Sequence, residues 1–170
     1  WADDFSEGLA CVEKDGKYGF INKDGEEVVK PIYDWAADFS KGLARVKKYN
    51  MWSFINKEGK EVIKPIYDGV SRFSEGLACV KKNNKYGFIN KEGKKVVKPI
   101  YDDALILRNG LALIKKDGKY GFINKKGKKV VKPIYDYIYN FHEGLACIKR
   151  NGKYGFINKD GEEIIKPVYD

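Results

Sequence analysis

Five aspartates recur at one spacing along the chain, and they are the first residues to consider for chemistry. They end Pro-Ile-Tyr-Asp or Pro-Val-Tyr-Asp motifs, and they are Asp34, Asp68, Asp102, Asp136 and Asp170. Carboxylates brought together could bind a metal or act as general acids and bases, but acid–base work needs two groups in unlike environments. These five are equivalent, and no second acid accompanies them. We therefore expect each to hold a turn by accepting hydrogen bonds from backbone amides.

Cysteine and histidine, which supply nucleophiles and metal ligands, are sparse. Cys11, Cys79 and Cys147 lie at 68-residue intervals, and His142 is the single histidine. A zinc site needs ligands at short spacing, which this arrangement does not provide. An odd number of cysteines gives no disulfide framework. We predict free thiols that fill small apolar spaces, and we predict no metal site, no cofactor and no enzymatic activity.

Aromatic and basic side chains remain, and they indicate binding. Trp1, Trp35 and Trp52 gather near the start of the chain, which makes this region the better candidate for a non-uniform site. A second set of candidates consists of lysines near aromatic residues: Lys81, Lys82, Lys94, Lys95, Lys115, Lys116, Lys128 and Lys129. Regularly spaced tyrosines and tryptophans could stack on sugars. The alternative is that their rings fill the space between sheets.

Charge is distributed unevenly along the chain. The net charge is +9, but the first 34 residues carry −5, whereas residues 69–102 carry +5 and residues 103–136 carry +6. Such asymmetry can attract a polyanion or let copies associate, although lysines that keep exposed strand edges soluble are the simpler interpretation. Only four of the 33 basic residues are arginine. Because readout of bases relies on arginine forks, we expect no sequence-specific binding of nucleic acid.

These residues sit on a 34-residue unit that occurs five times without insertion or deletion. One glycine and one proline mark the period in every unit: Gly8, Gly42, Gly76, Gly110 and Gly144, and Pro31, Pro65, Pro99, Pro133 and Pro167. A period of this length indicates a repeat architecture. We predict a single repeat domain, 1–170, made of the units 1–34, 35–68, 69–102, 103–136 and 137–170.

Each unit contains three short runs rich in Val, Ile, Phe and Tyr, separated by turns such as Asp15-Gly16. This pattern predicts β-hairpins. Helical periodicity is absent, and no window approaches 18 apolar residues, so neither a helix nor a membrane span is expected. Residues 9–12 are apolar on both sides of the strand, which predicts sheets covered on both faces. Three antiparallel strands leave the chain at the opposite end, so residues 31–39 must return it, as a fourth extended segment or a long crossing.

Four extended segments in each unit describe a propeller blade or one rung of a sheet stack. An open stack needs atypical polar repeats at its ends, whereas the first and last units resemble the middle ones. We therefore predict an all-β fold of tandem 34-residue repeats with short antiparallel strands, in a five-bladed propeller-like ring. The alternative is an open β-solenoid or a stacked-sheet superhelix.

The motifs Gly8-Leu-Ala, Tyr18-Gly-Phe-Ile-Asn-Lys and Lys30-Pro-Ile-Tyr-Asp34 resemble those of the bacterial WG-repeat family, also called KWG repeats. The resemblance covers all five units. The Trp-Gly signature of the family is mostly Tyr-Gly here, and the second unit has Trp52 followed by Ser53. The resemblance implies a bacterial origin and a binding or scaffolding role, with no catalytic residues to transfer.

The function predicted from sequence is a non-enzymatic β-repeat module for protein–protein interaction or self-assembly. Its partner is a protein or further copies of the chain. The alternative is a lectin-like binder of glycans or polyanions that uses the repeated Tyr, Trp and Lys residues. The chain carries no recognisable signal sequence, and the compartment stays open.

Overall fold

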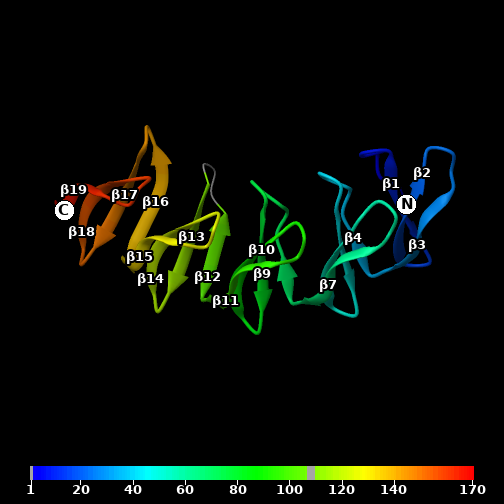
Figure 1. Ribbon diagram of the computed structural model, residues 1–170, viewed down its shortest axis with the longest axis horizontal. Helices are drawn as coiled ribbons and strands as arrows, with labels where there is room; N and C mark the ends of the chain where they lie inside the picture. The colour runs from blue at the N-terminus through cyan, green and yellow to red at the C-terminus, as the bar shows by residue number, and fades with distance from the viewer. Residues whose placement is uncertain (1, 107–109) are drawn as a thin grey trace. The chain divides into compact units, whose positions relative to one another are not determined.

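Every regular element of the protein is a β-strand in residues 2–106 and 110–170, which this computed structural model describes. The strands form five antiparallel sheets, which can be followed in chain order from blue to red in Figure 1. The all-β prediction is confirmed, because these described ranges contain no helix. The candidate residue Trp1 lies outside the described residues.

Each sheet takes its strands from one stretch of the chain. The first sheet contains β1 (Leu9–Lys14), β2 (Lys17–Asn22) and β3 (Glu27–Tyr33). The second contains β4 (Trp35–Ala36), β5 (Ala44–Lys48), β6 (Met51–Ile55) and β7 (Glu61–Tyr67). The third contains β8 (Gly69–Val70), β9 (Leu77–Lys82), β10 (Lys85–Asn90) and β11 (Lys95–Tyr101). The fourth contains β12 (Asp103–Ile106), β13 (Leu111–Lys116), β14 (Lys119–Asn124) and β15 (Lys129–Tyr135). The fifth contains β16 (Tyr137–His142), β17 (Leu145–Arg150), β18 (Lys153–Asn158) and β19 (Glu163–Tyr169).

Two kinds of turn connect the strands of a sheet. The first is a two-residue loop with positive φ at both positions, such as Asp15 (φ 52°) and Gly16 (φ 71°). This is the type I′ geometry that matches the twist of a hairpin. In the second turn the side-chain oxygen of Asn22 accepts hydrogen bonds from the backbone N–H groups of Asp24 and Glu26. Asparagine therefore shapes this turn through its side chain and does not adopt the left-handed backbone itself.

Proline lies inside the last strand of each sheet, which is an edge strand. In the first sheet Pro31 belongs to β3, so proline marks the edge but does not end the strand. The register of β3 against β2 shifts on both sides of Phe20. A Cβ on Gly19 would lie 2.4 Å from the carbonyl oxygen of Val29 and 2.7 Å from the Pro31 nitrogen. Only a residue without a side chain fits here unless the backbone moves.

The segment after each aspartate supplies a fourth strand to the next sheet, which confirms the extended return segment. Trp35 of β4 pairs with Lys47 of β5, and Ala36 pairs with Val46. In the first sheet Ala2 forms an isolated bridge with Val12 at the corresponding place.

Adjacent sheets bury their apolar residues against one another. We call one side of each sheet the front face; in the first sheet it carries Leu9, Cys11, Phe20, Val29 and Tyr33. The back face carries the side chains that point the other way, which in the second sheet are Ala36, Ala44, Val46 and Ile55. These two faces form one buried cluster together with Phe39. The fronts of the third and fourth sheets pack in the same way on the backs of the fourth and fifth.

The chain divides into two compact units. The first comprises Trp1–Arg72, Val80–Asn83 and Lys91–Lys94, and the second comprises Phe73–Cys79, Asn84–Asn90 and Lys95–Asp170. The choice between a closed ring and an open stack concerns the placement of these units, and it stays a prediction.

Candidate functional site

The second sheet brings together the two tryptophans of the predicted site that the structure describes. Trp35 begins β4, and Trp52 lies on β6. Lys47 of the intervening strand β5 pairs with Trp35 on one side and with Trp52 on the other. Paired residues of antiparallel strands project from the same face, so the three side chains form a row across the sheet.

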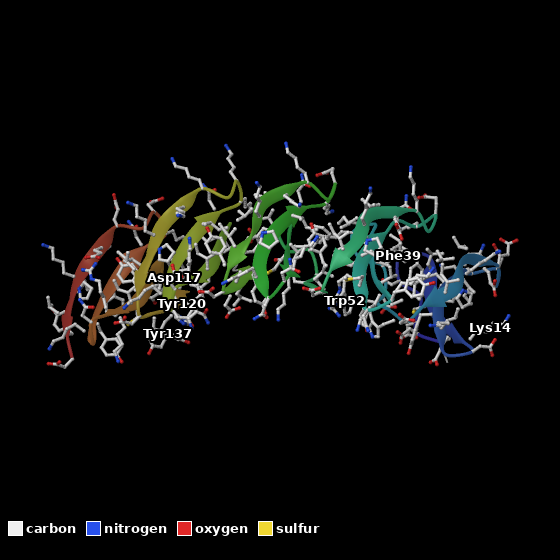
Figure 2. The ribbon with its side chains drawn as sticks, turned by 90° about the horizontal axis from the view of Figure 1, so that it is seen from below. Lys14, Phe39, Trp52, Asp117, Tyr120 and Tyr137 are labelled. Atoms are coloured by element: carbon white, nitrogen blue, oxygen red, sulfur yellow. The ribbon has the colours of Figure 1, made fainter. Side chains whose placement is uncertain are left out.

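Arg45 lies beside both tryptophans of this row and forms a cluster with them. The two indole rings meet in a T-shaped arrangement with centroids 5.1 Å apart. The guanidinium carbon of Arg45 lies 5.5 Å from the ring centroid of Trp35 and 6.0 Å from that of Trp52. The Nζ of Lys47 is 5.8 Å from the Trp52 centroid. We call these four residues the tryptophan cluster; Figure 2 labels Trp52.

The tryptophan cluster is cationic and partly withdrawn from water. All four side chains are half-buried. Burial lowers the pKa of the Arg45 guanidinium, and the charge of Arg72 lowers it further. Its Nη1 donates a hydrogen bond to the carbonyl oxygen of Val70 at 3.3 Å. A cation over an aromatic ring stabilises by about 0.5 to 2 kcal/mol, more where water is excluded, so these contacts help to order the cluster.

The second compact unit carries a tyrosine version of the same row. Lys149 pairs with Tyr137 on one side and with Tyr154 on the other, and its Nζ lies 4.9 Å from the Tyr154 centroid. The rings of Tyr137 and Tyr139 are 4.7 Å apart, and Tyr120 of the fourth sheet lies 5.5 Å from Tyr137 (Figure 2). Tyr137 and Tyr139 are each 46% exposed. We call these five residues the tyrosine cluster.

The predicted lysines are spread along the third and fourth sheets. Lys115 lies beside an aromatic ring, with its Nζ 5.0 Å from the Tyr120 centroid. Lys116 pairs with Lys119 and Lys129 pairs with Ile123, so four residues of β14, roughly 13 Å of strand, separate the two positions. The other members also lie at strand ends: Lys81 and Lys82 at the end of β9, Lys94 and Lys95 at the start of β11, and Lys128 before β15.

Sequence reasoning missed Arg45, Lys47 and Lys149 as members of a site. The signal was present in the hairpin register. A two-residue turn at Tyr49 and Asn50 places Lys47 directly opposite Trp52, and the same spacing places Lys149 opposite Tyr154.

The ten recurring aromatics divide into two groups. Tyrosines of the Pro-Ile-Tyr-Asp motif fill the space between sheets: Tyr33, Tyr101 and Tyr135 are only 2 to 4% exposed. The aromatic residue before Phe-Ile-Asn instead stays half-buried beside a lysine, as Trp52 and Tyr120 do. The second group and Tyr169, which is 60% exposed, can therefore contribute to a surface site.

The recurring aspartates connect one sheet to the next. In Asp102, one carboxylate oxygen accepts a hydrogen bond from Lys85 Nζ at 2.5 Å, and the other accepts one from the backbone N–H of Asp117 at 2.7 Å. The hydrogen bond from Lys85 holds the pKa of Asp102 below its ordinary value, and the amide of Asp117 lowers it further. The expectation that backbone amides hold these carboxylates is confirmed for Asp34, Asp68, Asp102 and Asp136. The amide, however, belongs to the first hairpin turn of the next sheet.

The remaining groups that could do chemistry are buried or isolated. All three cysteines are free thiols. Burial raises the pKa of Cys11 to about 12 and that of Cys79 to about 12, which leaves almost no thiolate at neutral pH. The described residues contain no group of three His, Cys, Asp or Glu side chains placed to hold a metal ion. They also contain no helix with the length and apolar character needed to cross a membrane.

The repeated antiparallel sheets define a repeat protein with a propeller-like fold. The "WG containing repeat" family model matches residues 1–18, 18–52, 52–86, 86–120, 120–154 and 154–170, so the chain belongs to this family. None of the curated proteins matches it.

Solved β-propeller-like structures resemble the chain in fold alone. The structure of Kluyveromyces lactis Hsv2p has a TM-score of 0.50 and 10% identity, over 94% of this chain and 60% of that one. The crystal structure of the eukaryotic initiation factor has a TM-score of 0.53 and 12% identity, over 99% of this chain. The chain thus spans 53 to 60% of the length of these two structures.

Proposed function

We propose that the protein is a non-catalytic binding module whose tryptophan cluster contacts an acidic segment of a protein partner. The arrangement of Trp35, Trp52, Arg45 and Lys47 carries the proposal, because two half-buried indoles and two cations converge on one face of one sheet. Tryptophan, tyrosine and arginine are the residues most enriched among interface hot spots. The cations favour a negatively charged partner.

Two observations support a role without catalysis. The carboxylates that recur in the repeats are engaged by lysines and backbone amides, which lowers the pKa of Asp34, Asp102 and Asp136 and makes them poor proton donors and acceptors at neutral pH. The thiols of Cys11 and Cys79 have raised pKa values, which makes them poor nucleophiles.

The ring geometry favours a protein partner over a glycan. A sugar stacks on a free aromatic face, but the indoles of Trp35 and Trp52 meet edge to face and share the Arg45 guanidinium. A peptide can instead pack apolar side chains on the exposed ring edges while its carboxylates approach Arg45 and Lys47. Repeat proteins commonly bind partners through such broad surfaces.

The test uses peptides selected from a display library of short random sequences against the wild-type chain, with affinity measured by calorimetry. The variant Trp35→Gly, Arg45→Cys, Trp52→Tyr installs the residues that the third repeat has at these positions, namely Gly69, Cys79 and Tyr86. We expect acidic peptides, and a loss of affinity of about tenfold or more in the variant, as for a hot-spot cluster.

The matched control is Lys128→Glu with Lys129→Glu, which alters predicted binding lysines outside the cluster and should leave peptide affinity within about twofold. If the lysine variant loses binding and the cluster variant keeps it, with a steep dependence on salt, the protein binds polyanions. Competition by soluble saccharides would identify a lectin-like site. Either result overturns the proposal.

A further inference from the structure

The front face of the fifth sheet is more exposed than the front faces of the other four sheets. Within the repeats, Tyr33, Tyr101 and Tyr135 of the front face are 2 to 4% exposed, whereas the equivalent Tyr169 is 60% exposed. Ile165 is 36% exposed, and its equivalent Val131 is 5% exposed. The front face of the fifth sheet is therefore an exposed apolar surface, whereas the equivalent faces of the other sheets are part of the core.

An open pocket of about 590 Å³ lies on this front face. Leu145, Cys147 and Phe156 form its apolar floor, and Glu143 and Tyr154 lie among its lining residues. In the first and fourth sheets the corresponding place is filled by a phenylalanine of the following repeat. Phe39 lies 4.7 Å from Phe20, and Phe141 of the fifth repeat lies 5.4 Å from Phe122.

The first sheet presents the complementary surface. Its Phe5 is 49% exposed, although the equivalent Phe39 is 2% exposed. Val12 and Ile21 on its back face are half-buried, whereas their equivalents are fully buried: Val46, Ile55, Ile114, Ile123, Ile148 and Ile157 are each 0% exposed. The first sheet therefore presents an exposed phenylalanine and a partly exposed back face. In the second and fifth sheets the equivalent groups pack on the front face of the preceding sheet.

Two polar contacts between adjacent sheets are incomplete at the ends of the array. Between the fourth and fifth sheets, the hydroxyl of Tyr135 donates to Glu163 at 2.6 Å, and Arg150 binds the same carboxylate at 2.7 Å. At the equivalent positions of the first sheet, Lys14 and Glu27 form an ion pair at 3.8 Å. Tyr169 of the fifth sheet is equivalent to Tyr135, the tyrosine that completes this contact between the fourth and fifth sheets.

The second polar contact involves a glutamate in the loop before the front face. The Glu7 carboxylate accepts hydrogen bonds from the backbone N–H groups of Lys41 and Gly42 in the next repeat, at 2.6 and 3.0 Å. Glu75 accepts one from the N–H of Gly110 at 2.7 Å. The equivalent Glu143 has no hydrogen-bond partner among the described residues. The backbone N–H groups of Glu7 and Gly8 in a first sheet are the matching donors.

We propose that the front face of the fifth sheet binds the back face of the first sheet of a second copy of this chain. The interface continues the packing between repeats, with Phe5 of one copy entering the pocket beside Phe156 of the other. Because each copy contributes a different surface, the contact is heterologous and can propagate head to tail. This inference concerns surfaces separate from the tryptophan cluster and does not depend on the proposed function.

The test compares the mass of the 170-residue chain across a range of concentrations by sedimentation velocity. Phe5→Asp with Val12→Lys blocks the first sheet, and Ile165→Lys with Tyr169→Glu blocks the fifth. The wild type should gain mass with concentration, while each blocked variant stays monomeric. A mixture of the two blocked variants retains one intact face of each kind and should form a one-to-one dimer that does not grow further.

Ile134→Lys serves as the matched control, because Ile134 is 44% exposed on β15 but lies outside both end faces; this variant should assemble like the wild type. Alkylation of Cys147 gives a second readout, since assembly should slow it at least severalfold. A wild type that stays monomeric at all concentrations overturns the proposal. If Cys147 is nevertheless protected and Phe5→Asp exposes it, the first sheet of the same chain is the occupant.

Discussion

At the scale of single residues, Ser53 stands where the four other repeats have glycine. Its side chain is 1% exposed, and its hydroxyl has no hydrogen-bond partner in the described part of the chain. At the equivalent Gly19, Gly87, Gly121 and Gly155, an added Cβ would lie 2.4 to 2.6 Å from a carbonyl oxygen of the edge strand. The second repeat carries an unsatisfied buried hydroxyl at this position.

We predict that Ser53→Gly stabilises the protein by about 1 kcal/mol. Removing an unsatisfied buried hydroxyl gains about 1 to 3 kcal/mol, which is offset in part by about 0.5 to 1 kcal/mol for the flexibility of glycine in the unfolded chain. Urea unfolding measures the difference, and Ser40→Gly at an exposed position is the control. A lower unfolding midpoint for Ser53→Gly would contradict this account.

The residue types in the site could be predicted, but not all of their partners. The sequence indicated a candidate non-uniform site because Trp1, Trp35 and Trp52 gather near the start of the chain. It did not show that Arg45 joins Trp35 and Trp52, because β4 contributes only two paired residues and its register follows from the folded sheet. Asp102 was correctly expected to bind a backbone amide, but contacts between sheets determine that this amide is that of Asp117.

At the scale of the element, each sheet depends on the close approach of its edge strand. We predict that Gly121→Ala destabilises the protein by about 3 kcal/mol, as a severe backbone clash does, because the new Cβ would lie 2.5 Å from the Val131 carbonyl oxygen and 2.8 Å from the Pro133 nitrogen. Both neighbours are backbone atoms of β15, which cannot rotate away.

Gly118→Ala is the matched control for this prediction. Gly118 has a φ of 78°, and no atom lies within 4 Å of the position that a Cβ would take there. The alanine at this position therefore meets only backbone strain of about 1 to 2 kcal/mol. Thermal unfolding of both variants should rank Gly121→Ala as the less stable protein. Equal effects would show that the contact with β15 relaxes.

Most elements were predictable because each obeys a local rule. Glycine at the turn positions, short runs rich in Val, Ile, Phe and Tyr, and the absence of helical periodicity identified the three main strands of each repeat. The position of Pro31 was only partly predictable. Proline lacks a backbone donor and is therefore typical of strand ends and edge strands. Here β3 continues past Pro31 to Tyr33, because the shifted register around Val29 accommodates the missing donor.

At the scale of the whole molecule, the recurring carboxylates should make stability depend on pH, because Asp34 and Asp102 each bind a lysine of their own repeat and a backbone amide of the next. Hydrogen bonds from lysines or backbone amides lower the carboxyl pKa values of Asp34, Asp102 and Asp136. A lowered folded-state pKa means that the contribution to stability is complete above the unfolded value, about 3.9, and is lost as the pH falls through the folded value. Asp38 acts in the opposite direction, because burial and Asp3 raise its pKa.

We therefore predict that the urea midpoint is unchanged between pH 7 and about pH 5 and falls below about pH 4. In the second repeat, Met51 is equivalent to Lys85, and Asp68 is equivalent to Asp102. The variant Lys85→Met therefore reproduces the second repeat at this position. This variant should show a smaller fall in the midpoint between neutral and acidic pH than the wild type. An equal fall in both proteins would show that the Lys85–Asp102 contact does not contribute.

The repeat length and the family could be predicted because every unit keeps the same length and motifs. The exposure of side chains on the first and fifth sheets could not, because the first and last units have the same sequence pattern as the middle ones. Burial depends on a neighbour: Phe5 and Phe39 occupy equivalent positions, yet one is 49% exposed and the other 2%.

The hairpin connections described above also bear on how the chain folds during synthesis. Every pairing within a sheet joins strands that are consecutive in the chain, so no sheet waits for a distant segment. Such low contact order favours fast formation of each sheet. A sheet can therefore form while the ribosome is still adding the next one, and each new repeat then finds a folded surface on which to pack.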